Sequence, residues 1–152
     1  MKICIACSAG GHLTEMMLLS KVYSVYDHFF LTTKRQDTID LSKEERVIFI
    51  TDPGRNPFLL LKNIIESFRV IRKERPDIIM STGAGIALAP CYIAKFLFRE
   101  KTKVIWIDGI AAVYKKSLSG RLAYPMADLF LVQWKGMCKK YGKNTKYWGA
   151  VI

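Results

Sequence analysis

The stretch that most constrains the fold is Lys2–Leu13, in which a strand ends in a glycine turn and a helix follows at once. Ile3–Ala6 is a continuous apolar run, which is typical of a strand buried on both faces of a parallel sheet. Residues 8–11, SAGG, interrupt it, and an apolar helical stripe begins at Leu13. Free backbone N–H groups and the helix dipole at such a turn favour a bound anion.

The rest of the chain repeats this strand–loop–helix unit. The expected strands are His28–Thr32, Arg46–Thr51, Asp77–Met80, Val104–Ile107, Leu129–Val132 and a short one at Tyr147–Gly149. Alternating strands and helices predict a doubly wound, mostly parallel, Rossmann-like α/β sheet, and we expect residues 1–152 to form one such domain. Ligands of this fold bind beyond the carboxyl ends of the strands, where residues 8–12, 81–85, 108–109 and 133–134 are expected to lie.

Three longer helices connect these strands. They are expected at Gly11–Tyr23, from Pro57 to just before Pro76, and at Ile86–Phe98. Asn56 is a good N-cap and Pro57 suits the first helical position. Apolar side chains recur at 3–4 spacing along this helix, with charged ones elsewhere, as in an amphipathic helix; they are Leu61, Ile64, Ile65, Phe68 and Ile71. The polar segment 33–45 is interpreted as a surface connection.

The charge predicts an acidic partner. Lys and Arg number 24 against 13 acidic residues, a formal net charge of +11. Nucleic acid, an anionic membrane surface and a phosphorylated ligand all fit that charge, but no nucleic-acid-binding motif is present. No apolar run reaches the roughly 20 residues of a spanning helix. The chain opens in a strand with no visible signal peptide or anchor, so membrane attachment is expected to be peripheral, on a cytoplasmic protein.

Cofactor and metal motifs are missing from the sequence. A dinucleotide site needs G-x-G-x-x-G in the first turn and an acid after the second strand, but the chain has SAGGH and Thr32-Thr33-Lys34 there. No G-K-[ST] follows the glycines. Cys4 and Cys7 lie three apart in a strand and point to opposite faces, so they cannot share a metal or a disulfide. We expect buried thiols, no metal and no cofactor.

Two side chains are candidates for acid–base chemistry. His12 begins the first helix, where a neutral imidazole can donate to a phosphate or accept a proton from a hydroxyl; capping of local backbone is the alternative. Asp108 stands at the carboxyl end of a strand and is equally suited to an Asp-Gly turn. Glu15 is interpreted as an acid that favours the first turn of the helix. Residues 114–121, YKKSLSGR, are interpreted as a diphosphate grip or a solvated loop.

Three motifs occur in the order of a known family. They are SAGGHLTEM at 8–16, STGAGIALAP at 81–90 and IDGIAAVYKKSLSGRLAYPMADLFLVQW at 107–134. The chain resembles the acceptor-side subunit of bipartite glycosyltransferases. In eukaryotes this subunit belongs to the enzyme that adds the second N-acetylglucosamine to dolichol diphosphate, and in bacteria it is the PssD or CpsF type of polysaccharide-biosynthesis protein.

This resemblance implies a fold similar to the N-terminal half of a GT-B transferase such as MurG. It implies a subunit of an inverting, metal-independent glycosyltransferase that moves a hexose from a UDP-sugar to a polyprenyl-diphosphate-linked sugar in capsule or exopolysaccharide synthesis. A separate donor-binding subunit would form a heterodimer with this chain, which would lie on the inner face of the cell membrane.

Site residues follow from the same resemblance. His12 is the first candidate for the catalytic base and Asp108, where the family usually carries glutamate, is the second. The residues expected to bind the acceptor diphosphate are Ser8, Gly10, Gly11, Thr82, Gly83, Ser119 and Arg121. The alternatives are a non-catalytic membrane scaffold that recruits the donor subunit and a basic nucleic-acid-binding module.

Overall fold

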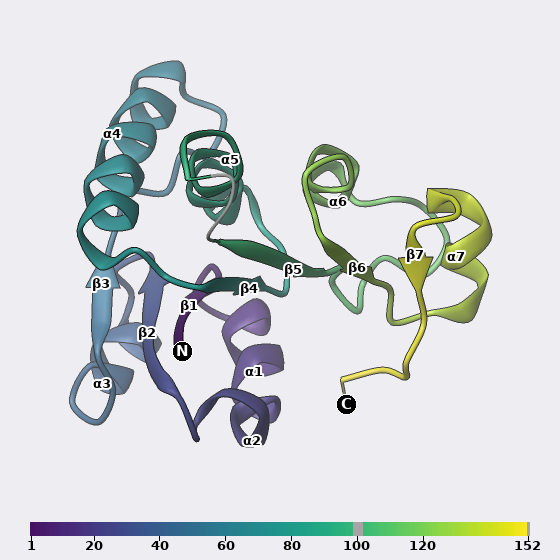
Figure 1. Cartoon of the computed structure of the whole chain (residues 1–152), viewed down its shortest axis with the longest axis horizontal. Helices are drawn as coiled ribbons and strands as arrows, with labels where there is room; N and C mark the ends of the chain where they lie inside the picture. Colours follow the sequence, from purple (N-terminus) through teal and green to yellow (C-terminus); the bar gives the residue numbers. More distant parts are fainter. Residues whose placement is uncertain (99–101, 152) are drawn as a thin grey trace.

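The protein is described by a computed structural model that covers residues 1–98 and 102–151. Within these residues one parallel sheet has seven strands in the order β3-β2-β1-β4-β5-β6-β7 (Figure 1). Its strands are β1 (Lys2–Ala6), β2 (Asp27–Thr32), β3 (Val47–Phe49), β4 (Ile78–Ser81), β5 (Lys103–Ile107), β6 (Leu129–Leu131) and β7 (Thr145–Lys146). The order reverses between β1 and β4, which makes their carboxyl ends the topological switch point where ligands of this fold bind.

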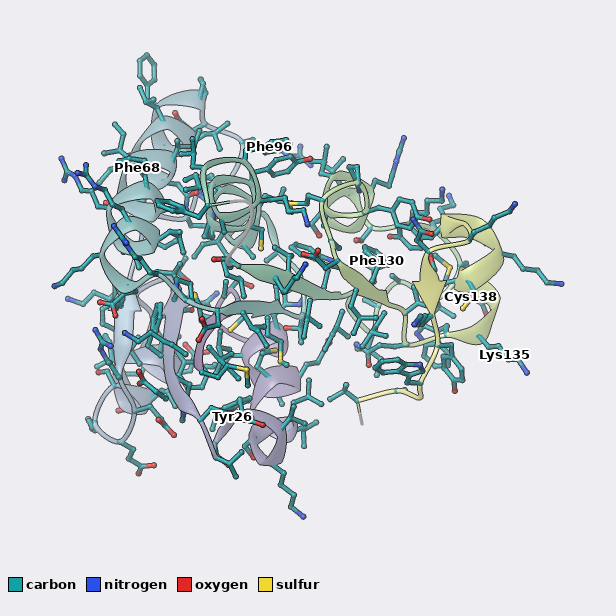
Figure 2. All side chains as sticks on the ribbon, in the orientation of Figure 1. Tyr26, Phe68, Phe96, Phe130, Lys135 and Cys138 are labelled. Carbon is teal, nitrogen blue, oxygen red and sulfur yellow. The ribbon has the colours of Figure 1, made fainter. Side chains whose placement is uncertain are left out.

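Helices cover both faces of the sheet. They are α1 (Gly11–Leu18), α2 (Ser20–Tyr23), α3 (Gln36–Leu41), α4 (Pro57–Glu74), α5 (Leu88–Leu97), α6 (Leu118–Ala123) and α7 (Lys135–Tyr141), with a 3-10 turn η1 (Gly85–Ala87) before α5. Side chains of α4 to α7 pack in one core with Cys4, and those of α1 to α3 pack in a second core with Cys7. Phe130 is a central member of the first core (Figure 2). The doubly wound fold is confirmed, as is the placement of Cys4 and Cys7 on opposite faces.

Three local expectations were wrong. The first helix is broken at Leu19, which leaves helical geometry at ψ 9°. The polar segment 33–45 contains α3, because the buried Thr38 hydroxyl donates to the Thr33 carbonyl and accepts from the Arg35 N–H. The last strand is β7 rather than 147–149, with Thr145 opposite Phe130 in the register of β6. Each of these features depends on a contact that apolar spacing does not reveal.

Helix α4 has the expected ends, and its apolar stripe is divided between the core and the surface. The Asn56 side chain accepts from the N–H groups of Phe58 and Leu59, and the helix ends at a left-handed Arg75 before Pro76. The buried positions are Asn63, Ser67, Ile71 and Glu74. Of the apolar stripe, Ile71 is buried and Phe68 is half-buried. Leu61, Ile64 and Ile65, in the first half of the helix, are exposed.

Glu74 joins the end of α4 to the edge of the sheet. Its carboxylate lies 2.7 Å from Arg46 Nη2 and 3.3 Å from Lys2 Nζ. Burial acts to raise the pKa of Glu74, but the hydrogen bonds from Arg46 and Lys2 outweigh it and hold that pKa below its ordinary 4.5. The ionised carboxylate therefore stabilises the folded state at neutral pH. This contribution is lost as the pH falls from 4.5 through the lower folded pKa.

Glu74→Gln is accordingly expected to lower the free energy of unfolding by about 1 kcal/mol at pH 7, since both cations stay partly exposed. It should also flatten the decline of stability below pH 4.5. Chemical denaturation across the acid range measures both effects, with the exposed Glu44→Gln as the matched control. Equal acid sensitivity of wild type and Glu74→Gln would contradict the assigned role.

None of the helices in the described residues is both long enough and apolar enough to cross a membrane.

Candidate functional site at the switch point

The loops after β1, β4, β5 and β6 meet at one edge of the sheet, as the sequence predicted. The Thr82 hydroxyl donates to the backbone oxygen of His12 at 2.8 Å. The Gln133 amide donates to the backbone oxygen of Asp108 at 3.1 Å. Four segments far apart in sequence are therefore tied together beside the switch point, and the start of α1 lies among them.

The ring of His12 lies in a slot between two glycines. A Cβ atom placed on Gly83 would lie 2.9 Å from His12 Cε1, and one placed on Gly109 would lie 3.0 Å from the same atom. Its Nδ1 is buried without a hydrogen-bond partner in the described residues, and the residue as a whole is half-buried. The slot thus fixes the ring of a histidine that is still partly open to solvent.

The loop after β4 is held in an unusual backbone conformation beside this slot. Gly83 has φ +121°, a value that favours glycine, and Ala84 has φ +76°. The Gly83 N–H donates to the Ser81 hydroxyl at 3.0 Å. A left-handed alanine costs about 1 kcal/mol or more, and such strain concentrates at functional sites. Two residues of this loop position His12. Thr82 holds its backbone oxygen by a hydrogen bond, and Gly83 lies against its ring.

Glu15 has a role that sequence reasoning missed. It is buried beyond the first turn of α1, so it is not the helix-start acid that was expected. Its carboxylate accepts from the Gln133 amide at 2.7 Å and from the Ile110 N–H at 3.3 Å. The Gln133 oxygen accepts in turn from the Val151 N–H at 2.8 Å. Glu15 and Gln133 together fix the loop that carries Gly109. The sequence gives one indication of this role, which is that Glu15 follows His12 by one helical turn.

Asp108 is held by hydroxyl groups from α6 and α7. Its side chain is 2% exposed, one oxygen accepts from Ser117 at 2.6 Å, and the other accepts from Tyr141 at 2.7 Å. Burial raises the pKa of Tyr141, and the hydrogen bond to the carboxylate raises it further, so the phenol stays protonated as a donor. Because both carboxylate oxygens are engaged, these contacts favour a positioning role for Asp108 over proton transfer.

The glycine turn departs from the expected anion site at one position. The Gly10 N–H donates to the Asp37 carboxylate at 2.7 Å, so this N–H is not free to hold a diphosphate. A carboxylate beside the turn also repels a second anion. Ser8 is half-buried and Gly11 is exposed at the same turn. The predicted diphosphate contact of Gly10 stays a prediction, and in this structure α3 places Asp37 at that N–H from a segment that was interpreted as a surface connection.

The two predicted α6 residues face different surroundings. Ser119 lines a groove of about 590 Å³ with Arg55, Leu60 and Leu88. Arg121 lines a separate concave region of about 490 Å³ with Lys115, Lys116, Lys140 and Tyr114. The structure thus clusters His12, Thr82 and Gly83, and it places Ser119 and Arg121 on neighbouring surfaces of α6. In residues 1–98 and 102–151 no group of three or more His, Cys, Asp or Glu side chains has the arrangement of a metal site.

Solved structures similar to this chain have the same fold. MurG of Acinetobacter baumannii matches with a TM-score of 0.78 and 13% identity over 99% of this chain. UDP-N-acetylglucosamine 2-epimerase of Rickettsia bellii matches with a TM-score of 0.77 and 11% identity, also over 99% of this chain. Each match covers 45% of the larger protein, so the chain corresponds to under half of those molecules. The likeness establishes the Rossmann-like, GT-B-type fold.

Proteins related to this chain in sequence match it over most of their own length. The UDP-N-acetylglucosamine transferase subunit ALG14 of Candida albicans is 39% identical, over 99% of this chain and 78% of the relative. The corresponding subunit of Schizosaccharomyces pombe is 31% identical, over 94% of this chain and 80% of the relative. Human ALG14 is 24% identical, over 100% of this chain and 83% of the relative.

The family model described as "Oligosaccharide biosynthesis protein Alg14 like" matches residues 54–151, which include β4, β5, β6 and the loops that enclose His12. Together with the fungal relatives, this match shows that the chain belongs to the Alg14-like family of oligosaccharide biosynthesis proteins.

Proposed function

We propose that this chain is the acceptor-side subunit of a two-component inverting glycosyltransferase. It would move a hexose from a UDP-sugar to a polyprenyl-diphosphate-linked sugar for a cell-surface polysaccharide, at the inner face of the membrane. The observation that carries this proposal is the His12 slot, a histidine held between Gly83 and Gly109 at the switch point of a GT-B-type fold. The names of its relatives, UDP-N-acetylglucosamine transferase subunits, support the reaction class.

In this proposal His12 Nε2 accepts the proton of the acceptor hydroxyl. The hydroxyl oxygen then bonds to the anomeric carbon of the donor as the bond from that carbon to the UDP oxygen breaks, and the electron pair leaves with UDP. Attack on the opposite face inverts the anomeric centre. The buried Glu15 carboxylate, one helical turn after His12, holds the loop that carries Gly109 and so helps to position the ring.

The other residues keep the roles that the geometry supports. Thr82, Gly83 and Gly109 position His12, and Asp108 anchors α6 and α7 to the edge. Ser8 and Gly11 at the glycine turn, with Ser119 and Arg121 on α6, would contact the acceptor diphosphate. Gly10 would join them only if the diphosphate displaced Asp37. The donor nucleotide-sugar would be held by the partner subunit, because this chain corresponds to one half of a GT-B molecule.

Co-expression of the chain with a candidate donor subunit tests this proposal. Membranes that contain both chains are expected to transfer sugar from a UDP-sugar to lipid, with UDP-N-acetylglucosamine as the first donor to try. Either chain alone should be at least about 100-fold less active, since the two substrates are then not held together. Transfer by this chain alone would contradict the split-enzyme model. A chain that binds nucleic acid and supports no transfer would favour the nucleic-acid alternative.

A further inference from the structure

The first half of helix α4 exposes large apolar side chains. Its buried positions include the polar Asn63 and Ser67 as well as Ile71, and each of these three is 0% exposed. Along the other side Leu61 is 57% exposed, and Ile64 and Ile65 are also exposed. A surface helix normally shows the reverse pattern. The arrangement indicates that something outside the described chain covers the exposed side of α4.

The exposed apolar surface continues from α4 to α6. At the start of α4 Phe58 is 82% exposed, and at the start of α6 Leu118 is 73% exposed. The groove of about 590 Å³ lies between these two helices, with Leu60 on one wall and Leu122 on the other. Figure 1 shows α4, α5 and α6 together on one side of the sheet. We call this region, formed by residues 55–65 and 118–122, the α4–α6 face.

The charge around the α4–α6 face is positive. Exposed basic residues of the turn and of the two helices are Arg55, Lys62, Arg69, Arg72, Lys73 and Arg121. The acids of the same segments are fewer and are each engaged. Glu66 accepts from the Thr51 N–H at 2.6 Å and Asp52 accepts from the Gly54 N–H at 3.0 Å. Glu74 is paired with Arg46 and Lys2. The whole chain carries +11. Apolar side chains bordered by lysine and arginine are the pattern of a helix that lies in the interface of an anionic membrane.

We propose that the α4–α6 face is the surface by which this chain inserts into the headgroup region of an anionic membrane. Phe58, Leu61 and Leu118 enter the interface, and the basic residues meet lipid phosphates. This inference rests on the proposed function in one respect: the groove holds Ser119, so a lipid-linked acceptor would reach the site from the membrane side. The positive rim favours a bilayer over an apolar protein partner or a second equally basic copy.

Vesicle sedimentation tests the proposal with the chain alone. The wild type is expected to bind vesicles of phosphatidylcholine that contain phosphatidylglycerol, and to bind pure phosphatidylcholine less. Phe58→Ser combined with Leu61→Ser should weaken binding about 100-fold, since two large apolar side chains no longer enter the interface. Lys62→Gln should weaken it about fivefold on the anionic vesicles alone.

Val25→Ser is the matched control, because Val25 is an equally exposed apolar side chain. It adjoins Tyr26, which Figure 2 shows beside α2, away from α4. Circular dichroism of the double variant checks that the fold is retained. Loss of binding by the double variant together with full binding by Val25→Ser supports the α4–α6 face.

Three results would overturn the inference. In the first, the wild type binds no vesicles. In the second, the double variant binds vesicles as well as the wild type does. In the third, light scattering finds the wild type as a dimer and the double variant as a monomer. The assay contains neither donor nor partner subunit, so its result is independent of transfer. Intact transfer without vesicle binding overturns only this inference, and vesicle binding without transfer overturns only the proposed function.

Discussion

Replacing His12 with alanine is expected to reduce sugar transfer by the two-subunit enzyme by about 100-fold to 10,000-fold, the range contributed by a general base. The change should leave stability nearly unaltered, since the ring makes no hydrogen bond in the described residues through its buried Nδ1. The measurement is the initial rate of transfer to lipid at saturating donor, with thermal unfolding measured on the same preparations.

His12→Gln separates a base from a binding group. Glutamine can donate a hydrogen bond near the position of Nε2, but it cannot accept a proton at neutral pH. We expect it to be as inactive as His12→Ala. Recovery of much of the wild-type rate by the glutamine variant would instead assign His12 to acceptor binding.

His28→Ala is the matched control for these variants. His28 lies in β2 near the opposite edge of the sheet, where its Nδ1 is 2.9 Å from the Tyr26 carbonyl and its Nε2 is 3.1 Å from the Glu45 carboxylate. Its replacement should leave transfer unchanged. Gly109→Ala should act like a His12 variant, because the added methyl group meets the His12 ring at 3.0 Å. Full activity of Gly109→Ala would argue against the slot as a positioning device.

Gly120→Ala is expected to destabilise the fold by about 3 kcal/mol, although alanine normally favours a helix over glycine by about 1 kcal/mol. A Cβ at Gly120 would lie 2.4 Å from the Tyr141 hydroxyl, 2.5 Å from Asp108 Oδ1 and 2.7 Å from the Ser117 hydroxyl. The Ser117 and Tyr141 hydroxyls both donate to the Asp108 carboxylate, so none of the three can move aside without breaking a bond in the interior.

Gly136→Ala gives the matched comparison in α7. A Cβ on Gly136 meets nothing within 4 Å, so the ordinary helix preference applies and stability should rise by up to about 1 kcal/mol. Thermal unfolding followed by circular dichroism measures both variants, and Gly120→Ala should melt about 10 °C lower than the wild type. A melting temperature at or above that of the wild type would show that Asp108 does not hold α6 in this way.

The local patterns of the sequence were sufficient for the architecture. Apolar runs that end in glycine, such as Ile3–Ala6 before residues 8–11, predicted buried parallel strands and a binding edge at their carboxyl ends. Asn56, Pro57 and Pro76 predicted both ends of α4. These signals depend on backbone conformation and on neighbours within one or two turns. Such signals can therefore be recognised without knowledge of the rest of the chain.

Other features depend on which segments meet, and the sequence did not reveal them. The spacing of the apolar residues identified a stripe on α4 but not which of its members would be buried: Ile71 is, whereas Leu61 is exposed. The Gly10 N–H donates a hydrogen bond to Asp37 because α3 lies beside the glycine turn. The sequence made Asp108 a candidate base or a turn residue, and only the structure shows that Ser117 and Tyr141 engage both of its oxygens.

The sequence by itself determined the strand–turn–helix units, their order and His12 at the start of α1. Only the tertiary structure decided that His12 lies between Gly83 and Gly109 and that Glu15 joins Gln133. It also decided that the first half of α4 exposes its apolar side chains. The physical reason is range. Periodicity and capping act between residues that are close along the chain, whereas burial and hydrogen bonding of a side chain depend on residues about 70 to 120 positions away, brought together by the parallel crossovers of the sheet.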